Sequence, residues 1–318
     1  MPTIGVVFPG QGSQAAGMGA DAAAHVPAAR ECFERASAVL GYDLLALVVD
    51  GDEARLRDTR ISQPAIFTAN VAIYRAVEAA GFTPIVSGGH SFGEFCSLTI
   101  ARAIGFDDAV ALVHERGLAM GEAADASPGA MAAVIGFDQA TVEKLCAEAR
   151  AASGARVDVA NLNAPVQIVV SGDEAGVNEL CELAKAGGAK RVVMLNVSGA
   201  WHSELMEPAM RRFAAHIEKA PFALPAFDVI GNVEVAPYRN IEDIRRCLIA
   251  SLCARVRWHE TSVAIAARKP DLLVECGATP VLAPMLKRID GVSSDRVFHV
   301  ADHAGVERLI AAGERLTV

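Results

Sequence analysis

A short apolar run that ends in a glycine-bracketed serine limits the fold of this chain more than any other feature. Residues 84–88 (PIVSG) read as a buried strand, residues 89–93 (GHSFG) follow, and a helical pattern begins after Ser91. Two glycines permit a turn too tight for a Cβ atom, and such a turn lifts a serine hydroxyl out of the backbone. This strand–turn–helix context predicts a nucleophile elbow with Ser91 as the candidate nucleophile. A glycine-rich turn with a helix-capping serine is the alternative.

The same alternation of strand and helix patterns extends over most of the chain. Short apolar runs predict strands, and apolar residues at helical spacing predict helices. The strands are expected at residues 4–8, 84–88, 227–230, 272–276 and 297–300, and the helices at 21–40, 64–80, 106–122 and 203–219. Such alternation is typical of a parallel sheet covered by helices.

A different order interrupts this pattern between residues 127 and 198. The predicted strands are 130–135, 156–160, 167–170 and 190–195, with helices at 138–152 and 173–186. This β-α-β-β-α-β order is that of ferredoxin-like units. We therefore predict an α/β fold in which residues 1–127 and 198–318 form a large domain and residues 128–197 an inserted ferredoxin-like subdomain.

Charge and cysteine usage exclude several classes of protein. The chain of 318 residues has 29 basic and 38 acidic side chains, a net charge of −9, which disfavours nucleic-acid binding. The 7 cysteines form no CxxC pair, which argues against a disulfide scaffold or a zinc site and favours buried thiols in a reducing cytosol. The uncharged stretch 61–74 is too short and too polar to span a bilayer, and no signal peptide is evident. We expect a cytoplasmic protein with no membrane contact.

A nucleophilic serine needs a base, and histidine is the usual one. Of the 8 histidines, His202 stands out because it lies in a loop of small residues, 197–203 (VSGAWHS), directly after the last strand of the insert. Clefts commonly form at such domain junctions. Position by itself leaves a capping or core histidine as the alternative.

Several stretches together resemble the malonyl-CoA:acyl-carrier-protein transacylases, the acyltransferase family of fatty-acid and polyketide synthesis. They occur in order along essentially the whole chain. They are residues 8–14 (FPGQGSQ), 89–94 (GHSFGE), 115–117 (ERG), 129–134 (GAMAAV), 161–167 (NLNAPVQ), 170–172 (VSG) and 197–203 (VSGAWHS). The resemblance implies an α/β-hydrolase-like domain with a ferredoxin-like insert.

The resemblance also implies a role for each matching residue. Ser91 would be the nucleophile, and His202 its base, oriented by a backbone carbonyl in place of a carboxylate. The backbone N–H groups of Gln11 and Phe92 would form the oxyanion hole. Arg116 would pair with the free carboxylate of the acyl group, a geometry that suits a planar guanidinium. Without the resemblance, Arg116 reads as a surface arginine paired with a neighbouring glutamate, Glu115 or Glu122.

Some positions depart from the family's pattern. Ser251 stands where many relatives have glutamine, Phe92 is bulkier than the usual aliphatic residue, and Trp201 replaces a common phenylalanine. Trp201 and Ser251 are expected at the substrate, together with Asn161 and Asn163. Turn formation is an equally good account of the two asparagines.

The implied reaction is ping-pong transfer of a malonyl group from malonyl-CoA to the phosphopantetheine thiol of an acyl carrier protein. It requires no metal and no other cofactor, and we expect a monomer. An acidic carrier protein would need a basic patch, for which the candidate residues are Lys185, Lys190, Arg191, Lys287 and Arg288. The alternatives are a hydrolase that removes acyl groups from carrier proteins, a trans-acting polyketide acyltransferase with another extender unit, and a non-catalytic docking subunit.

Overall fold

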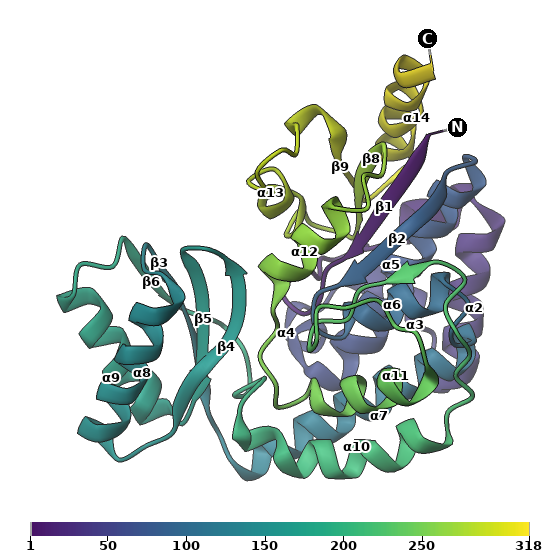
Figure 1. The fold of residues 1–318 in the computed structure, drawn as a ribbon. Coiled ribbons are helices and arrows are strands. Elements are labelled where there is room, and N and C mark those ends of the chain that lie inside the picture. Colours follow the sequence, from purple (N-terminus) through teal and green to yellow (C-terminus); the bar gives the residue numbers. More distant parts are fainter. Residues whose placement is uncertain (1, 318) are drawn as a thin grey trace.

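The computed structural model describes residues 2–317, which form two sheets of different type with helices around them (Figure 1). The larger sheet is parallel and has the strand order β7-β2-β1-β8-β9. Its strands are β1 (Thr3–Phe8), β2 (Thr83–Gly89), β7 (Asp228–Val229), β8 (Leu272–Cys276) and β9 (Val297–Val300). All five lie where the sequence predicts strands, although β7 is shorter than the predicted run at 227–230.

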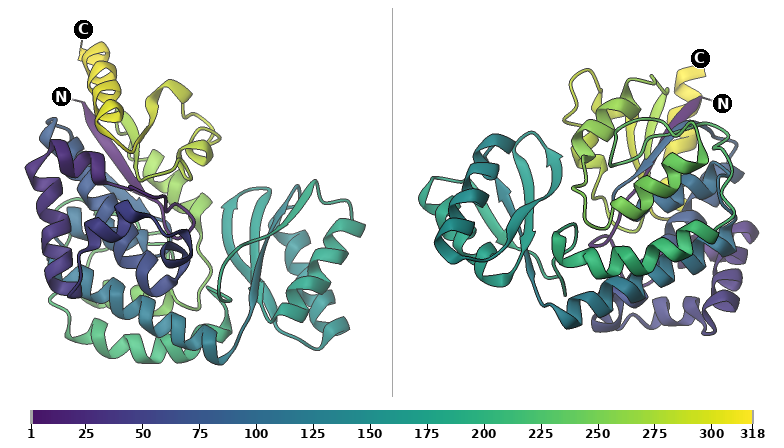
Figure 2. Two further views of the ribbon diagram at one scale, coloured as in Figure 1. Left: turned by 180° about the vertical axis from the view of Figure 1, so that it is seen from behind. Right: turned by 60° about the horizontal axis from the view of Figure 1, so that its bottom comes forward.

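Burial explains why these short runs become strands. β1 lies between β2 and β8, and all but its first residue is buried, as is every residue of β8. Continuous apolar runs of this kind suit parallel strands that are covered on both faces. Helices pack around the sheet, and the N- and C-terminal ends of the chain lie close together at one end of the molecule (Figure 2).

The helices of this larger unit include several that the sequence patterns do not predict. They are α1 (Ala20–His25), α2 (Pro27–Leu40), α3 (Leu44–Asp50), α4 (Glu53–Arg57), α5 (Thr59–Ala79), α6 (Gly93–Ile100), α7 (Phe106–Ala126), α10 (Glu207–Lys219), α11 (Ile241–Ala250), α12 (Trp258–Ala266), α13 (Ala283–Leu286) and α14 (His303–Thr317). Two 3₁₀ turns, Glu204–Met206 and Ser294–Arg296, complete the set.

Two helix predictions are wrong in their limits. The expected helix at 21–40 is two helices, because Val26 is extended (φ −123°, ψ 115°) and Pro27 begins α2. The helix expected at 64–80 begins earlier, at Thr59, because the Asp58 side chain accepts a hydrogen bond from the Arg60 N–H and caps it. Pro64 therefore lies inside α5 and does not start it.

Residues 130–194 form the smaller unit, which has its own sheet and its own apolar core. The elements are β3 (Ala130–Ile135), α8 (Gln139–Ser153), β4 (Val157–Ala164), β5 (Gln167–Gly172), α9 (Glu174–Ala186) and β6 (Arg191–Met194). The sheet is antiparallel with the order β4-β5-β3-β6. Its core includes Val134, Val142, Val170 and Leu180. The predicted element order is observed, and β4 continues past residue 160 to Ala164.

A short backbone pairing joins the two units beside the site described below. The Leu162 N–H donates to the Val256 carbonyl oxygen, and the Val256 N–H to the Ala160 carbonyl oxygen, both at 2.8 Å. This pairing fixes Asn161, at the edge of the smaller unit, against the larger one.

Within residues 2–317 no helix is both long and apolar enough to cross a membrane, and no group of three or more His, Cys, Asp or Glu side chains is placed to hold a metal ion. The cysteines are free thiols; Cys253 is half-buried and the other six are buried.

Candidate active site

Ser91 lies in a strained turn between β2 and α6, at the carboxyl edge of the parallel sheet. Its φ of 54° is in the left-handed region that non-glycine residues rarely adopt. A Cβ atom on Gly89 would come within 1.9 Å of the Gly93 backbone, and one on Gly93 within 2.4 Å of the Phe8 carbonyl oxygen. Only glycine fits at both positions, so the GxSxG spacing is a steric requirement of this turn.

The side chain of Asn232 holds both sides of the turn. Its Oδ1 accepts a hydrogen bond from the Ser91 N–H at 2.9 Å, and its Nδ2 donates to the Gly89 carbonyl oxygen at 2.8 Å. The Asn232 N–H in turn donates to the buried carboxylate of Glu94, which also accepts from the Tyr238 hydroxyl. Burial raises the pKa of Glu94 to about 7, although these two hydrogen bonds act to lower it. Sequence analysis misses Asn232, because 141 residues separate it from Ser91.

His202 contacts the hydroxyl of Ser91, with 2.8 Å between its Nε2 and the Ser91 Oγ. Its other ring nitrogen, Nδ1, lies 2.8 Å from the carbonyl oxygen of Ser251 and 3.1 Å from that of Ala254. Carbonyl oxygens only accept hydrogen bonds, so Nδ1 carries the proton and Nε2 has a free lone pair for the serine proton. The imidazole is thus oriented by backbone carbonyls at the end of α11.

The surroundings of His202 keep its imidazole neutral. The residue is 6% exposed, and burial, aided by the charge of Arg116 and by His90, lowers the pKa of His202 to about 3. A neutral imidazole is the form that can accept a proton from Ser91.

Arg116, from α7, places a buried guanidinium beside the serine. It is 1% exposed; its Nη1 donates to the Gln63 Oε1 at 2.8 Å and its Nη2 to the Ser91 Oγ at 3.3 Å. Burial lowers the pKa of Arg116 to about 10, which leaves it charged at neutral pH. The surface alternative is wrong, because Arg116 is buried and the half-buried Arg212 pairs with both Glu115 and Glu122. Within residues 2–317 no carboxylate lies within ion-pair distance of Arg116.

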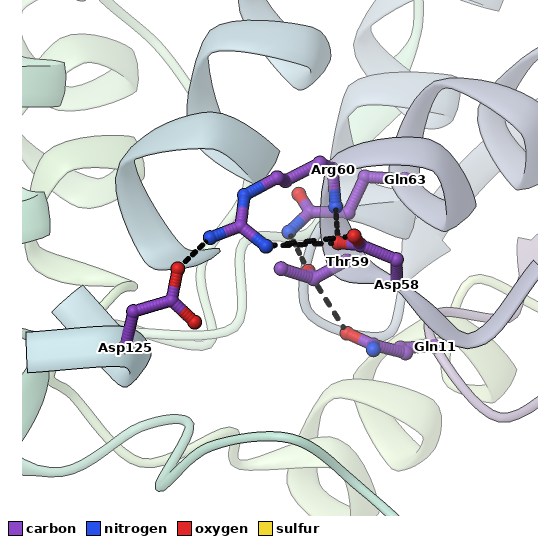
Figure 3. Close-up of polar contacts among 6 residues, drawn as sticks. All are labelled: Gln11, Asp58, Thr59, Arg60, Gln63 and Asp125. Carbon is purple, nitrogen blue, oxygen red and sulfur yellow. Dashed lines mark hydrogen bonds and ion pairs between the residues drawn. The ribbon is translucent and has the colours of Figure 1, made fainter. Parts of the chain in front are cut away.

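A relay of polar side chains supports Arg116 from α5. Thr59 accepts a hydrogen bond from the Gln63 Nε2 at 2.8 Å and contacts the Gln11 Oε1 at 3.4 Å (Figure 3). Gln63 is therefore held with its Oε1 toward Arg116. Gln63 lies in the uncharged stretch 61–74, and the sequence patterns do not indicate a role for it at the site.

Close approach of α5 and α7 makes this relay possible. A Cβ on Gly117 would lie 2.6 Å from the Thr59 carbonyl oxygen, so the glycine that follows Arg116 lets the start of α5 reach the guanidinium. Arg60 then joins the helices, since it pairs with Asp58 beside α5 and with Asp125 on α7 (Figure 3).

These side chains line one small cleft of about 90 Å³ between the two units. Its polar residues are Gln11, His90, Ser91, Arg116, Asn161 and His202, and its other residues are Phe92, Met120, Met131, Leu195, Val197 and Trp201. The lining set contains no Asp or Glu. The cleft combines one cation with largely apolar walls, so it favours a short anionic group.

Two residues expected at the substrate lie outside this lining. The Asn163 Oδ1 contacts the His90 Nε2 at 2.9 Å, and the Ser251 hydroxyl donates to the Leu248 carbonyl oxygen. Asn163 therefore positions His90, and Ser251 acts on His202 through its backbone carbonyl. Direct contact of Asn163 and Ser251 with substrate stays a prediction, because neither residue is part of the cleft lining. A serine in place of glutamine leaves that carbonyl unchanged.

The expected oxyanion donors flank the serine. Gln11 follows β1 and Phe92 follows Ser91, and both line the cleft. Neither backbone N–H is engaged by an acceptor within residues 2–317. Both groups are therefore free to bind an oxygen that becomes negatively charged.

A serine hydroxyl bonded to a neutral imidazole, in a cleft with free N–H donors, defines a serine acyl-transfer site. The comparisons with known proteins agree with this class. The model of the acyl transferase domain matches residues 6–310, and the chain belongs to this family.

The relatives are similar over almost their full length. The malonyl CoA-acyl carrier protein transacylase of Escherichia coli (strain K12) is 42% identical over 290 residues, which are 91% of this chain and 93% of that protein. The solved structure of the malonyl CoA-acyl carrier protein transacylase from Coxiella burnetii has a TM-score of 0.93 and 41% identity, and the match covers 100% of this chain and 99% of that one. A malonyl-transacylase in complex with its type II polyketide-synthase acyl-carrier protein has a TM-score of 0.90 and 38% identity, with 97% and 99% covered.

The hydrogen bonds of Asn232 generate the first prediction. Asn232→Ala leaves the Ser91 N–H and the Gly89 carbonyl without their side-chain partner, so we expect a loss of about 1–3 kcal/mol in the free energy of unfolding. We also expect the folded variant to form acyl-enzyme more slowly, because the Ser91 backbone loses the side chain that helps to hold its strained conformation. Denaturant unfolding measures the loss of stability. Intact-mass analysis of samples quenched at increasing reaction times measures the rate of acyl-enzyme formation.

Asn240→Ala is the matched control, because Asn240 caps α11 through the Asp243 N–H and its side chain makes no contact with the cleft. Loss of a cap costs about 1 kcal/mol. This variant should lose stability and keep its acylation rate. An Asn232→Ala protein that is destabilised but acylates at the normal rate would contradict the positioning role.

The low pKa of His202 generates the second prediction. An imidazole is neutral at any pH above its pKa. His202 should therefore remain the neutral Nδ1–H tautomer from pH 8 down to pH 5, because pH 5 is still about two units above its pKa of about 3. Nitrogen-15 histidine NMR, with the His202 signals assigned by their absence in His202→Asn, measures this. Uptake of a proton near pH 6.5, or an Nε2–H tautomer, would contradict the account.

Proposed function

We propose that this chain transfers a malonyl group from malonyl-CoA to the phosphopantetheine thiol of an acyl carrier protein, through an acyl-serine at Ser91. The names of its relatives support both the malonyl donor and the carrier protein. The observation that most favours malonyl as the acyl group is the buried guanidinium of Arg116, whose Nη2 lies 3.3 Å from the Ser91 Oγ.

Arg116 favours an acyl group with a free carboxylate because its charge has no ionic partner in the cleft. A buried charge without a partner is costly, by about 3–5 kcal/mol where one member of a buried pair is removed. A malonyl group would bring the missing carboxylate, while an acetyl group would leave the guanidinium unpaired. The difference corresponds to about 150- to 5,000-fold in rate.

In the first half-reaction the Ser91 Oγ attacks the thioester carbonyl while the His202 Nε2 takes the hydroxyl proton. The backbone N–H groups of Gln11 and Phe92 bind the oxyanion. The carbon–sulfur bond then breaks, and the coenzyme A sulfur receives the proton from His202. The product is a malonyl ester of Ser91 with its carboxylate on Arg116.

In the second half-reaction the phosphopantetheine thiol gives its proton to His202 and its sulfur attacks the ester. The carbon–oxygen bond breaks, and the proton returns to Ser91. No metal or redox cofactor takes part in the proposed route. The malonyl carboxylate also assists the base: by neutralising Arg116 it removes a charge that lowers the pKa of His202.

We also propose a specific fold for each of the two units. We assign residues 1–127 and 198–318 to an α/β-hydrolase-like catalytic domain and residues 128–197 to a ferredoxin-like subdomain. The strand–turn–helix around Ser91 and the β-α-β-β-α-β order of the smaller unit support this assignment. We further propose a monomer that acts in the cytoplasm.

A carrier-protein hydrolase with the same nucleophile is the nearest alternative, and Arg116 argues against it. Removal of assorted acyl groups does not require a charge that selects a carboxylate. The malonyl-enzyme should therefore persist in buffer and lose its acyl group rapidly when holo acyl carrier protein is added. Rapid loss to water without the carrier would favour the hydrolase, and no malonyl mass on the wild-type protein would favour a docking subunit.

Arg116→Ala tests the proposed substrate. We expect malonyl loading of Ser91 to fall about 150- to 5,000-fold, because the carboxylate loses its counter-charge. Acetyl loading should change far less, so the selectivity for malonyl should collapse. Competition between malonyl-CoA and acetyl-CoA, read by intact mass, measures the ratio.

Arg212→Ala is the matched control, since it removes a guanidinium next to the same helix but outside the cleft lining. Its malonyl-to-acetyl ratio should equal that of the wild type. Equal losses of malonyl and acetyl loading in Arg116→Ala would show that Arg116 is structural and would overturn the proposed substrate.

A further inference from the structure

Three buried polar side chains of α5 lie along one side of the helix and face the active-site segments. Thr59, Gln63 and Asn70 are spaced by about one and two helical turns, and none is more than 1% exposed. Thr59 contacts the side chain of Gln11 and Gln63 holds Arg116 (Figure 3). Asn70 continues this row, and the proposed reaction does not yet assign it a role.

The amide of Asn70 holds the backbone directly after β1. Its Nδ2 donates a hydrogen bond to the Pro9 carbonyl oxygen at 3.0 Å. Pro9 is the first residue after β1 and lies two residues before Gln11. Burying an amide group costs free energy unless the group is hydrogen-bonded, so this contact stabilises Asn70 at its position in the core. It also fixes the start of the segment that carries one of the two proposed oxyanion donors.

Ser13 holds the next carbonyl group of the same segment. The Gly10 carbonyl oxygen accepts a hydrogen bond from the Ser13 hydroxyl at 2.7 Å and from the Ser13 N–H at 3.3 Å. Ser13 is 1% exposed. The peptide bond between Gly10 and Gln11 is trans, so its C=O and N–H groups point in opposite directions. Fixing the Gly10 carbonyl therefore also fixes the direction of the Gln11 N–H.

The segment after β1 packs tightly against the turn that carries Ser91. A Cβ atom on Gly10 would lie 2.7 Å from the His90 carbonyl oxygen, and the His90 N–H donates to the Phe8 carbonyl oxygen at 2.9 Å. The backbone before Gln11 thus lies against the backbone before Ser91. The relative position of the two proposed oxyanion donors therefore depends on how this segment is held.

We propose that Asn70 and Ser13 are positioning residues for the oxyanion hole, because they hold the two carbonyl groups that precede the Gln11 N–H. This inference rests on the proposed function and deepens it. Neither side chain lines the cleft, so both act through the backbone. An oxyanion forms on every thioester that Ser91 attacks, so the two residues support the transfer of any acyl group. Arg116, in contrast, acts only on an acyl group with a carboxylate.

Asn70→Ala tests this role, because it removes the donor to the Pro9 carbonyl. Loss of a whole oxyanion donor costs about 10²- to 10³-fold in rate, and a displaced donor should cost less. We expect acyl-enzyme formation to slow by roughly 10- to 100-fold, and by the same factor with malonyl-CoA and acetyl-CoA. Affinity for malonyl-CoA should not change, because the oxyanion exists only in the reaction. Calorimetry on Ser91→Ala, with and without Asn70→Ala, measures that affinity.

Thr68→Ala is the matched control on the same helix. Thr68 is fully buried, its hydroxyl has no partner within residues 2–317, and it does not line the cleft. This variant should lose stability and keep the wild-type rate of acyl-enzyme formation. Ser13→Ala covers the case in which Asn70→Ala does not fold, because it removes only one hydroxyl. The Ser13 N–H remains, so we expect a smaller loss of roughly 2- to 10-fold, again equal for both acyl groups.

The possible outcomes separate this inference from the proposed function. Wild-type rates in the folded Asn70→Ala and Ser13→Ala variants would overturn the inference and leave the proposed function intact. So would a loss explained entirely by weaker binding of malonyl-CoA, or a loss confined to the malonyl group. Absence of any malonyl mass on the wild-type protein would overturn the proposed function itself.

Discussion

The unpaired guanidinium of Arg116 is the constraint on which the rest of the site depends. Water stabilises a charge far better than a protein interior does, so a folded chain keeps such a group buried only where its surroundings hold it firmly. Gln63 supplies the hydrogen bond, Thr59 fixes Gln63, and Gly117 lets the two helices approach. The same charge lowers the pKa of His202, so in the proposed reaction one group would influence both the choice of acyl group and the strength of the base.

The remaining machinery comes from segments that are far apart in the chain and meet at the carboxyl edge of the parallel sheet. β1 leads to Gln11 and β2 to Ser91, and His202 arrives on the loop that returns from the smaller unit. Ligands bind at this edge in open α/β sheets, because the strands end there and loops can converge. The carbonyls of Ser251 and Ala254 replace the carboxylate that orients the histidine in many serine enzymes, which keeps the cleft free of a competing anion.

Local patterns predict the parts of the structure that local chemistry decides. The turn around Ser91, the strands of the large sheet and the β-α-β-β-α-β order follow from glycine spacing and apolar periodicity. The loop position of His202 makes it a candidate base, and resemblance to a family adds Arg116 and Gln11. Asn232 could not be predicted, because its contact with Ser91 exists only after the sheet forms. Ser251 orients His202 through its backbone carbonyl. Every residue has such a carbonyl, so the identity of the side chain at position 251 could not indicate this role. α5 starts early because Asp58 caps it, and the helix expected at 21–40 breaks at Val26 because Pro27 begins a new one. Both residues are local sequence signals, but the prediction gave more weight to the helical spacing of the apolar residues around them.

A crystal structure of the protein trapped with malonyl-CoA tests the central claim most directly. The account predicts an ester between the Ser91 Oγ and the malonyl carbon, with the free carboxylate within hydrogen-bond distance of the Arg116 guanidinium. An acyl group on another side chain, or a carboxylate directed away from Arg116 into solvent, would contradict it.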